Sequence, residues 1–60
     1  MPERFEIKKS ANNQFYFLLI APNNEPIAKS EMYKTKDGCK NGIASVKKFA
    51  KTATIVDTVK

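Results

Sequence analysis

The sequence has no histidine and no tryptophan, and it has one cysteine and two glycines. A disulfide-stabilised scaffold and a Cys/His zinc site are excluded, because both need several such side chains. Catalysis with histidine as the base is excluded as well. The longest apolar run, residues 15–21, is far shorter than the roughly 20 residues of a membrane-spanning helix. No apolar segment of a signal peptide follows the first residues, so we expect a cytoplasmic protein.

The composition is typical of a small globular domain. Hydrophobic residues make up 42% of the chain and charged residues 28%, which is too apolar for a disordered segment. We expect a single domain over residues 1–60. A chain of this length buries only about 60% of the surface that its unfolded form exposes, so we expect marginal stability.

The chain is basic, with 11 lysines and arginines against six acidic residues, a net charge of +5. This balance favours a polyanionic partner such as a nucleic acid, or it serves solubility alone. The acidic residues are spread along the sequence, so no purely basic segment decides between the two.

Three segments in the first half of the chain have the patterns of β-strands. Residues 4–9 alternate between apolar and charged, residues 14–21 form the strongest strand, and residues 25–30 form a shorter one. Pro26 cannot donate to a ladder and indicates an edge position or the first residue of the strand. Asparagine-containing turns separate the segments, which together predict an antiparallel meander.

The period then changes from 2 to 3.6 and predicts an amphipathic helix over residues 36–50, with Thr35 as its N-cap. Gly42 in mid-helix costs about 1 kcal/mol relative to alanine, and we expect close packing against Phe15 or Phe17 to compensate. The predicted apolar face comprises Cys39, Gly42, Ile43, Val46, Phe49 and Ala50.

Residues 53–59 are rich in β-branched side chains and predict a short C-terminal strand. The predicted fold class is therefore α+β: a three-stranded antiparallel meander followed by one amphipathic helix and a short C-terminal strand, assembled as a two-fold dimer.

The dimer is expected because one copy leaves apolar surface uncovered. The strand at 14–21 is apolar on both faces, and one helix covers a single face. A C-terminal strand with a free edge adds a second uncovered surface. A two-fold homodimer, with or without exchanged C-terminal strands, would bury both, and the alternative is a monomer whose last strand folds back on its own sheet. The proposed interface residues are Tyr16, Leu18, Ile20, Ile55 and Val59.

Cys39 is the one conventional nucleophile candidate beyond the hydroxyl groups. Its place near the start of the helix, with Lys36 and Lys40 nearby, could lower the pKa of its thiol. We expect structural burial instead, because no histidine base is present and free cysteines are among the most buried residues. The carboxylates show no recognisable spacing, and there is no glycine-rich phosphate loop. We therefore expect no enzymatic activity, no catalytic residues, no cofactor and no metal site.

Four lysines of the predicted helix form a basic ridge along one border of its apolar face. At 100° per residue they lie within about 60° of one another. They are candidate contacts to the phosphates of a nucleic acid or another polyanion, without sequence recognition. The alternative is that their stems cover the apolar rim while the ammonium groups stay in water. This lysine ridge consists of Lys36, Lys40, Lys47 and Lys51.

Several short strings carry a family resemblance. They are FEIK at 5–8, QFYF at 14–17, IA at 27–28, Ser30-Glu31 followed by Tyr33, and NGIASVKK at 41–48. Together they resemble the YegP-like family of small uncharacterised bacterial proteins, and the last string resembles the family's most characteristic one. The resemblance extends over about residues 3–57.

The resemblance implies a β-β-β-α-β unit, used as a tandem pair or, in single-copy members, as a homodimer that imitates the pair. One copy here favours the homodimer. The family has no established biochemical activity, so the resemblance implies no catalytic residues. Three features depart from the family pattern: Asn23-Asn24 where Asn-Gly is usual, Pro26 where an aliphatic residue is usual, and apolar side chains on the outward face of the second strand, which is commonly polar.

Overall fold

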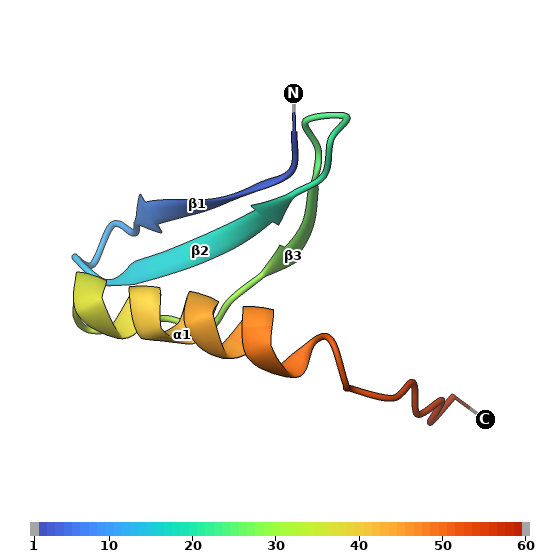
Figure 1. Cartoon of the computed structure of the whole chain (residues 1–60). Coiled ribbons are helices and arrows are strands. Elements are labelled where there is room, and N and C mark those ends of the chain that lie inside the picture. The colour runs from blue at the N-terminus through green and yellow to red at the C-terminus, as the bar shows by residue number, and fades with distance from the viewer. Residues whose placement is uncertain (1, 60) are drawn as a thin grey trace.

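The structure is a computed structural model that describes residues 2–59. Its elements are β1 (Arg4–Lys9), β2 (Phe15–Ile20), β3 (Pro26–Lys29) and α1 (Lys36–Phe49). The strands form one antiparallel sheet in the order β1-β2-β3, and α1 lies along one face of it (Figure 1). The predicted meander and helix are confirmed, with boundaries within one residue of those expected. Residues 1 and 60 of the predicted domain lie outside the described residues.

Both connections between the strands depend on asparagine. Asn13 has a φ of 63° and Asn24 a φ of 69°, in the left-handed region that asparagine tolerates better than most residues. The Asn13 amide donates to the Ser10 carbonyl at 3.1 Å, and the Asn24 amide donates to the Ala21 carbonyl at 2.8 Å. These hydrogen bonds close two tight turns and bring the three strands into register.

The register divides the side chains of the sheet between two faces. Ile7 lies opposite Phe17, and Phe5 lies opposite Leu19, on the inner face that α1 covers. The Phe5 and Phe17 rings pack edge to face with centroids 5.7 Å apart, and Phe17 is buried at the centre of the core. The outer face, directed away from α1, carries Arg4, Glu6, Lys8, Tyr16, Leu18, Ile20 and Lys29.

The chain continues beside β2 after β3 ends. The Phe17 amide donates to Ser30 Oγ at 2.8 Å, and Tyr33 exchanges two backbone hydrogen bonds of 2.7 Å with Phe15. This pairing carries the Tyr33 ring onto the inner face, where it stacks on Phe17 with centroids 6.2 Å apart. Tyr33 is therefore part of the core, although it lies in no regular strand.

The first turn of α1 has the expected cap. Thr35 Oγ1 accepts a hydrogen bond of 3.0 Å from the Gly38 amide, and Asp37 stands in the first turn, where the helix dipole favours a negative charge. Cys39 then enters the core and is completely buried. The N-terminal half of the helix is thus fixed both by its cap and by its packing.

Gly42 is the point of closest approach between α1 and the sheet. A Cβ atom at this position would lie 2.7 Å from Tyr33 Cζ and 3.2 Å from Phe17 Cε2, both inside van der Waals contact. Only glycine fits at this separation. The expectation that Gly42 packs against a bulky strand residue is confirmed, and that residue is Phe17.

The second half of α1 differs from the prediction. Val46 is 36% exposed and Phe49 is 58% exposed, and Ala50 is exposed as well. The prediction of an amphipathic helix with its apolar face toward the sheet therefore does not hold for this half of the helix in the single chain. The reason is geometric, because α1 packs against β2 near Gly42 and its C-terminal end diverges from the sheet (Figure 1).

Residues 53–59, the C-terminal tail, form no strand in the single chain. The amides of Thr52 and Ala53 both donate to the Phe49 carbonyl, at 3.2 and 2.9 Å, and the chain then leads away from the sheet (Figure 1). Ile55, Val56 and Val59 are 98%, 76% and 87% exposed. The predicted fourth strand is absent from this part of the structure because no sheet edge lies beside it.

The helix α1 has 14 residues, and within the described chain there is no helix of the length and hydropathy that a membrane crossing requires.

Candidate functional site

One member of the lysine ridge, Lys47, lies beside β1. Lys47 Nζ stands 5.8 Å from the centroid of the Phe5 ring, so its stem runs along the rim of the inner face. For Lys47, the structure therefore supports the alternative in which the lysine stem covers the apolar rim and the ammonium group stays in water. Lys36 and Lys40 precede it on the same helix, whereas Lys51 follows the end of α1, in the adjoining turn.

The ridge is not neutralised by acidic side chains. The ion pairs found among residues 2–59 join Glu6 to Arg4 and to Lys8, and none includes a ridge lysine. Between residues 36 and 51 Asp37 is the one acidic residue, against five lysines. The α1 side of the molecule therefore carries most of the net positive charge.

A second group of cations lies on the outer face, around the ring of Tyr16. Lys8 of β1 is the cross-strand partner of Tyr16, and Lys29 of β3 is the partner of Leu18. Lys29 Nζ stands 4.9 Å from the centroid of the Tyr16 ring, within cation–π distance. An aromatic ring on the central strand is thus flanked by lysines from both neighbouring strands.

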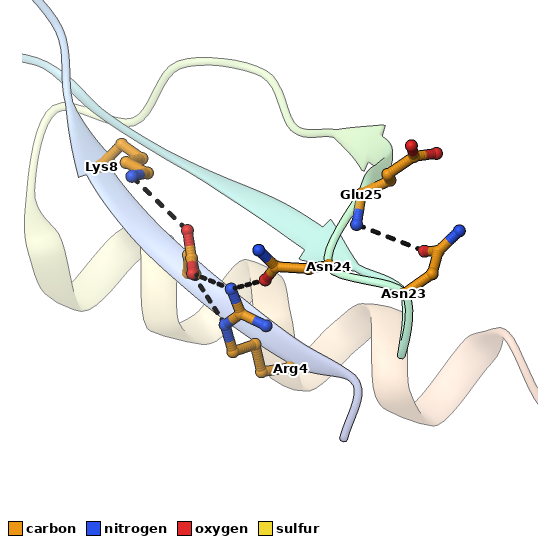
Figure 2. A network of polar contacts seen from close by, with 6 residues as sticks. Arg4, Lys8, Asn23, Asn24 and Glu25 are labelled. Atoms are coloured by element: carbon orange, nitrogen blue, oxygen red, sulfur yellow. Dashed lines mark hydrogen bonds and ion pairs between the residues drawn. The ribbon is translucent and has the colours of Figure 1, made fainter. Parts of the chain in front are cut away.

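A polar network on the same face extends from Lys8 to the turn at Asn24 (Figure 2). Arg4 Nε donates to Glu6 Oε2 at 2.7 Å, and Arg4 Nη2 donates to Asn24 Oδ1 at 2.6 Å. Lys8 Nζ lies 3.5 Å from Glu6 Oε1. The hydrogen bond from Arg4 lowers the pKa of the Glu6 carboxyl, and the charges of Arg4 and Lys8 act in the same direction.

Ile20, one of the proposed interface residues, lies next to this network. Ile20 is the cross-strand partner of Arg4 and is only 4% exposed in the single chain. The expectation that it forms part of an exposed apolar patch is therefore wrong for the single chain. The side chain of its cross-strand neighbour Arg4 is hydrogen-bonded to Glu6 and Asn24. Tyr16 and Leu18 are half-buried.

The other two proposed interface residues, Ile55 and Val59, are almost fully exposed. The tail that carries them leads away from the sheet that carries Tyr16 and Leu18 (Figure 1), so the single chain does not bring the five residues together. Their role in a dimer interface stays a prediction.

Cys39 is the only completely buried side chain among residues 2–59, and burial raises the pKa of its thiol. A reactive cysteine needs the opposite shift and access to solvent. The nearby lysines do not reverse the effect of burial, so the expected structural role is confirmed for this side chain. The described residues also hold no group of three or more His, Cys, Asp or Glu side chains that could bind a metal ion.

Sequence reasoning missed two features of the outer face: the placement of Lys8 and Lys29 around Tyr16, and the bond between Arg4 and Asn24. The alternation within residues 4–9 did assign Arg4 and Lys8 to one face. The sequence did not give the register of the strands. The register determines which residue of the neighbouring strand lies opposite Arg4 or Lys8.

Comparison with known proteins assigns the chain to a family. Residues 10–57 match the model of the domain of unknown function DUF1508. A UPF0339 protein of Treponema denticola is 47% identical over 57 residues, which cover 95% of this chain and 98% of that protein. The chain belongs to the DUF1508/UPF0339 family. The resemblance to YegP-like proteins is thereby confirmed.

Members of this family differ in length. The UPF0339 protein YegP of Escherichia coli is 44% identical over 55 residues, and this chain covers 50% of its length. A solution structure of a protein from Haloferax volcanii superimposes with a TM-score of 0.86 at 30% identity and covers 93% of this chain and 95% of that one. The unit described here therefore corresponds to nearly all of some relatives and to half of others.

Proposed function

We propose that this DUF1508 domain is a non-enzymatic cytoplasmic module that works as a homodimer, held together by exchange of the C-terminal tails. The observation that carries the proposal is the exposure of Ile55, Val56 and Val59, at 98%, 76% and 87%. Burying each such side chain contributes about 1.5–3 kcal/mol, which is large for a domain of this size.

Two further features support a second copy as the partner. The outer edge of β1, over Arg4–Lys9, and the outer edge of β3 are not paired within residues 2–59, and either can accept an added strand. Relatives of twice this length carry the matching segment over half of their chain, which agrees with two units working together. In the dimer the tail adopts the strand that its β-branched composition predicts.

Light scattering tests the association state. The dimer is expected at twice the chain mass of 6.8 kDa at micromolar concentration. Ile55→Asp with Val59→Asp places charges on one face of the exchanged strand and is expected to yield monomers. The matched control is Thr54→Asp with Thr58→Asp, on the other face of the same segment. Wild-type protein that remains at 6.8 kDa at this concentration would exclude the dimer.

A second candidate function is binding of the phosphate backbone of nucleic acid by the lysine ridge. It is favoured by the absence of any ion pair between these lysines and the carboxylates of residues 2–59. If four phosphates were engaged, the logarithm of the binding constant would fall with the logarithm of the salt concentration with a slope of roughly −3 to −4.

Gel shifts over a salt series with duplex DNA separate this candidate from the dimer alone. Changing Lys36, Lys40, Lys47 and Lys51 together to glutamate is expected to abolish the shift. Binding that persists in this variant would remove the ridge from consideration, and light scattering on the same sample checks that the association state is unchanged.

A further inference from the structure

The outer face of the sheet is left uncovered by the described part of the chain. α1 lies against the inner face, and within residues 2–59 no other element crosses the outer one (Figure 1). The face is not an apolar patch, because Ile20 is buried, Leu18 is half-buried and their neighbours across the sheet include charged residues. Its accessible features are the ring of Tyr16 and the charges around it.

The charges of this face are mostly positive. Arg4, Lys8 and Lys29 stand against the single carboxylate of Glu6. Glu6 is already engaged, at 2.7 Å from Arg4 and 3.5 Å from Lys8, and within the described chain Lys29 has no carboxylate partner. A two-fold contact through this face would bring the same cations together from both copies, so the charge disfavours a second chain and favours an anionic partner.

The position of the Tyr16 ring indicates which kind of anionic partner fits this face. Tyr16 lies on the central strand, with Lys8 on one side and Lys29, 4.9 Å from the ring centroid, on the other. Neighbouring strands are about 4.8 Å apart, so two cationic groups flank the ring within reach of a single bound segment. Proteins that bind single strands combine a cationic track for phosphates with aromatic rings on which bases stack.

We propose that the outer face binds single-stranded nucleic acid, with a base stacked on Tyr16 and the adjoining phosphates held by Lys8 and Lys29. On binding, the base takes the place of the Lys29 ammonium over the ring, and Lys29 moves to the phosphate. A duplex is not the ligand of this face, because its bases are already stacked on one another and offer no free surface to Tyr16. The site is separate from the lysine ridge and does not require the tail exchange.

Fluorescence anisotropy with labelled ten-nucleotide probes tests the proposal at low salt. The probes are oligothymidine, an abasic strand with the same number of phosphates, and a duplex of equal length. Oligothymidine is expected to bind about tenfold more tightly than the abasic strand, as stacking of one base would give. Equal affinity for the two strands, or no binding of oligothymidine up to millimolar protein, would overturn the proposal.

Matched variants locate the site. Tyr16→Leu is expected to reduce the affinity for oligothymidine about tenfold and to leave the abasic strand unaffected, whereas Tyr16→Phe keeps the ring and the affinity. Lys8→Gln with Lys29→Gln is expected to reduce the salt slope by about 1.4, corresponding to two phosphates. The control with the same charge change is Lys36→Gln with Lys40→Gln on α1.

The pattern of effects decides the outcome. If the α1 pair of substitutions weakens oligothymidine binding and the outer-face pair does not, the strand is held by the ridge and the proposal is wrong. A Tyr16→Leu variant that folds, as judged by circular dichroism, and binds as tightly as wild type also contradicts it. If Tyr16→Leu does not fold, the outer-face lysine pair, which changes only exposed side chains, gives the decision alone.

Discussion

The two halves of α1 show how one apolar pattern has two different outcomes. In the first half, Cys39 is completely buried and Gly42 allows the helix to touch Tyr33 and Phe17. In the second half, Phe49 continues the same stripe and is 58% exposed, although its ring is as apolar as that of Phe17. The difference teaches that helical periodicity marks the apolar stripe of a helix but not how far along the helix the sheet reaches. In the single chain only the first half of the stripe packs against the sheet.

The largest expected effect contrasts two phenylalanines. Phe17→Ala removes the ring at the centre of the core and is expected to destabilise the domain by about 3–5 kcal/mol, enough to unfold it. Phe49→Ala in dilute protein, where copies are separate, is expected to change stability by less than about 0.5 kcal/mol. Urea denaturation followed by circular dichroism measures both.

Measuring the effect of Phe49→Ala at several protein concentrations extends the comparison with Phe17→Ala. If the second half of α1 is covered in the dimer, the cost of Phe49→Ala should rise with protein concentration, since association stabilises the folded state by mass action. A large cost of Phe49→Ala in the monomer would mean that its ring is packed within the chain, contrary to its exposure.

The second prediction concerns the contact at Gly42. Alanine at an exposed helix position would gain about 1 kcal/mol over glycine. Here the added methyl group would lie 2.7 Å from Tyr33 Cζ, so we expect Gly42→Ala to destabilise by about 1–3 kcal/mol instead. The measurement is again the urea midpoint.

A double-mutant cycle identifies the cause. Tyr33→Leu removes the Cζ and Oη atoms that the methyl group would meet, so Gly42→Ala in that background should cost less or become stabilising. Equal costs of Gly42→Ala in both backgrounds would show that Tyr33 is not the obstacle.

The third prediction tests the burial of Cys39. Cys39→Ser puts a hydroxyl group in place of a thiol that is completely buried, and an unpaired buried hydroxyl costs about 1–3 kcal/mol. Cys39→Ala leaves only a small cavity, so it is expected to be less destabilising than serine by about 1 kcal/mol. Thermal unfolding compares the two. A serine variant as stable as the alanine variant would indicate that water or a polar group reaches the site.

The elements of the fold could be predicted from the sequence because their signals are local. Alternation marked the strands, asparagine pairs marked turns in which Asn13 and Asn24 adopt positive φ, and Thr35 marked the helix start. The glycine in mid-helix even indicated a close contact with Phe17. Tyr33 was not expected as a partner, because it lies in an irregular segment that periodicity does not describe.

Besides the C-terminal strand that residues 53–59 do not form and the exposed second half of α1, the errors concern contacts between strands. The cross-strand partner of Ile20 is Arg4, sixteen positions away, and the lysines around Tyr16 come from β1 and β3. Alternation gives the face on which a side chain lies, whereas the register decides its neighbours across the sheet, and one strand's sequence does not contain the register. The candidate site on the outer face was therefore visible only in the structure.

The smallest expected effect is electrostatic and compares Glu6 with and without its partner. The Arg4 hydrogen bond at 2.7 Å holds the pKa of Glu6 below its ordinary value of 4.5. Because the folded-state pKa is lowered, the stabilisation from this carboxylate is fully present above about pH 4.5 and is lost as the pH falls through the folded pKa. NMR titration of the Glu6 side chain measures that pKa directly. Arg4→Gln should return it toward 4.5, while Lys8→Gln, which removes an ion at 3.5 Å, should raise it less. A wild-type pKa at or above 4.5 would show that Arg4 does not hold Glu6 in solution.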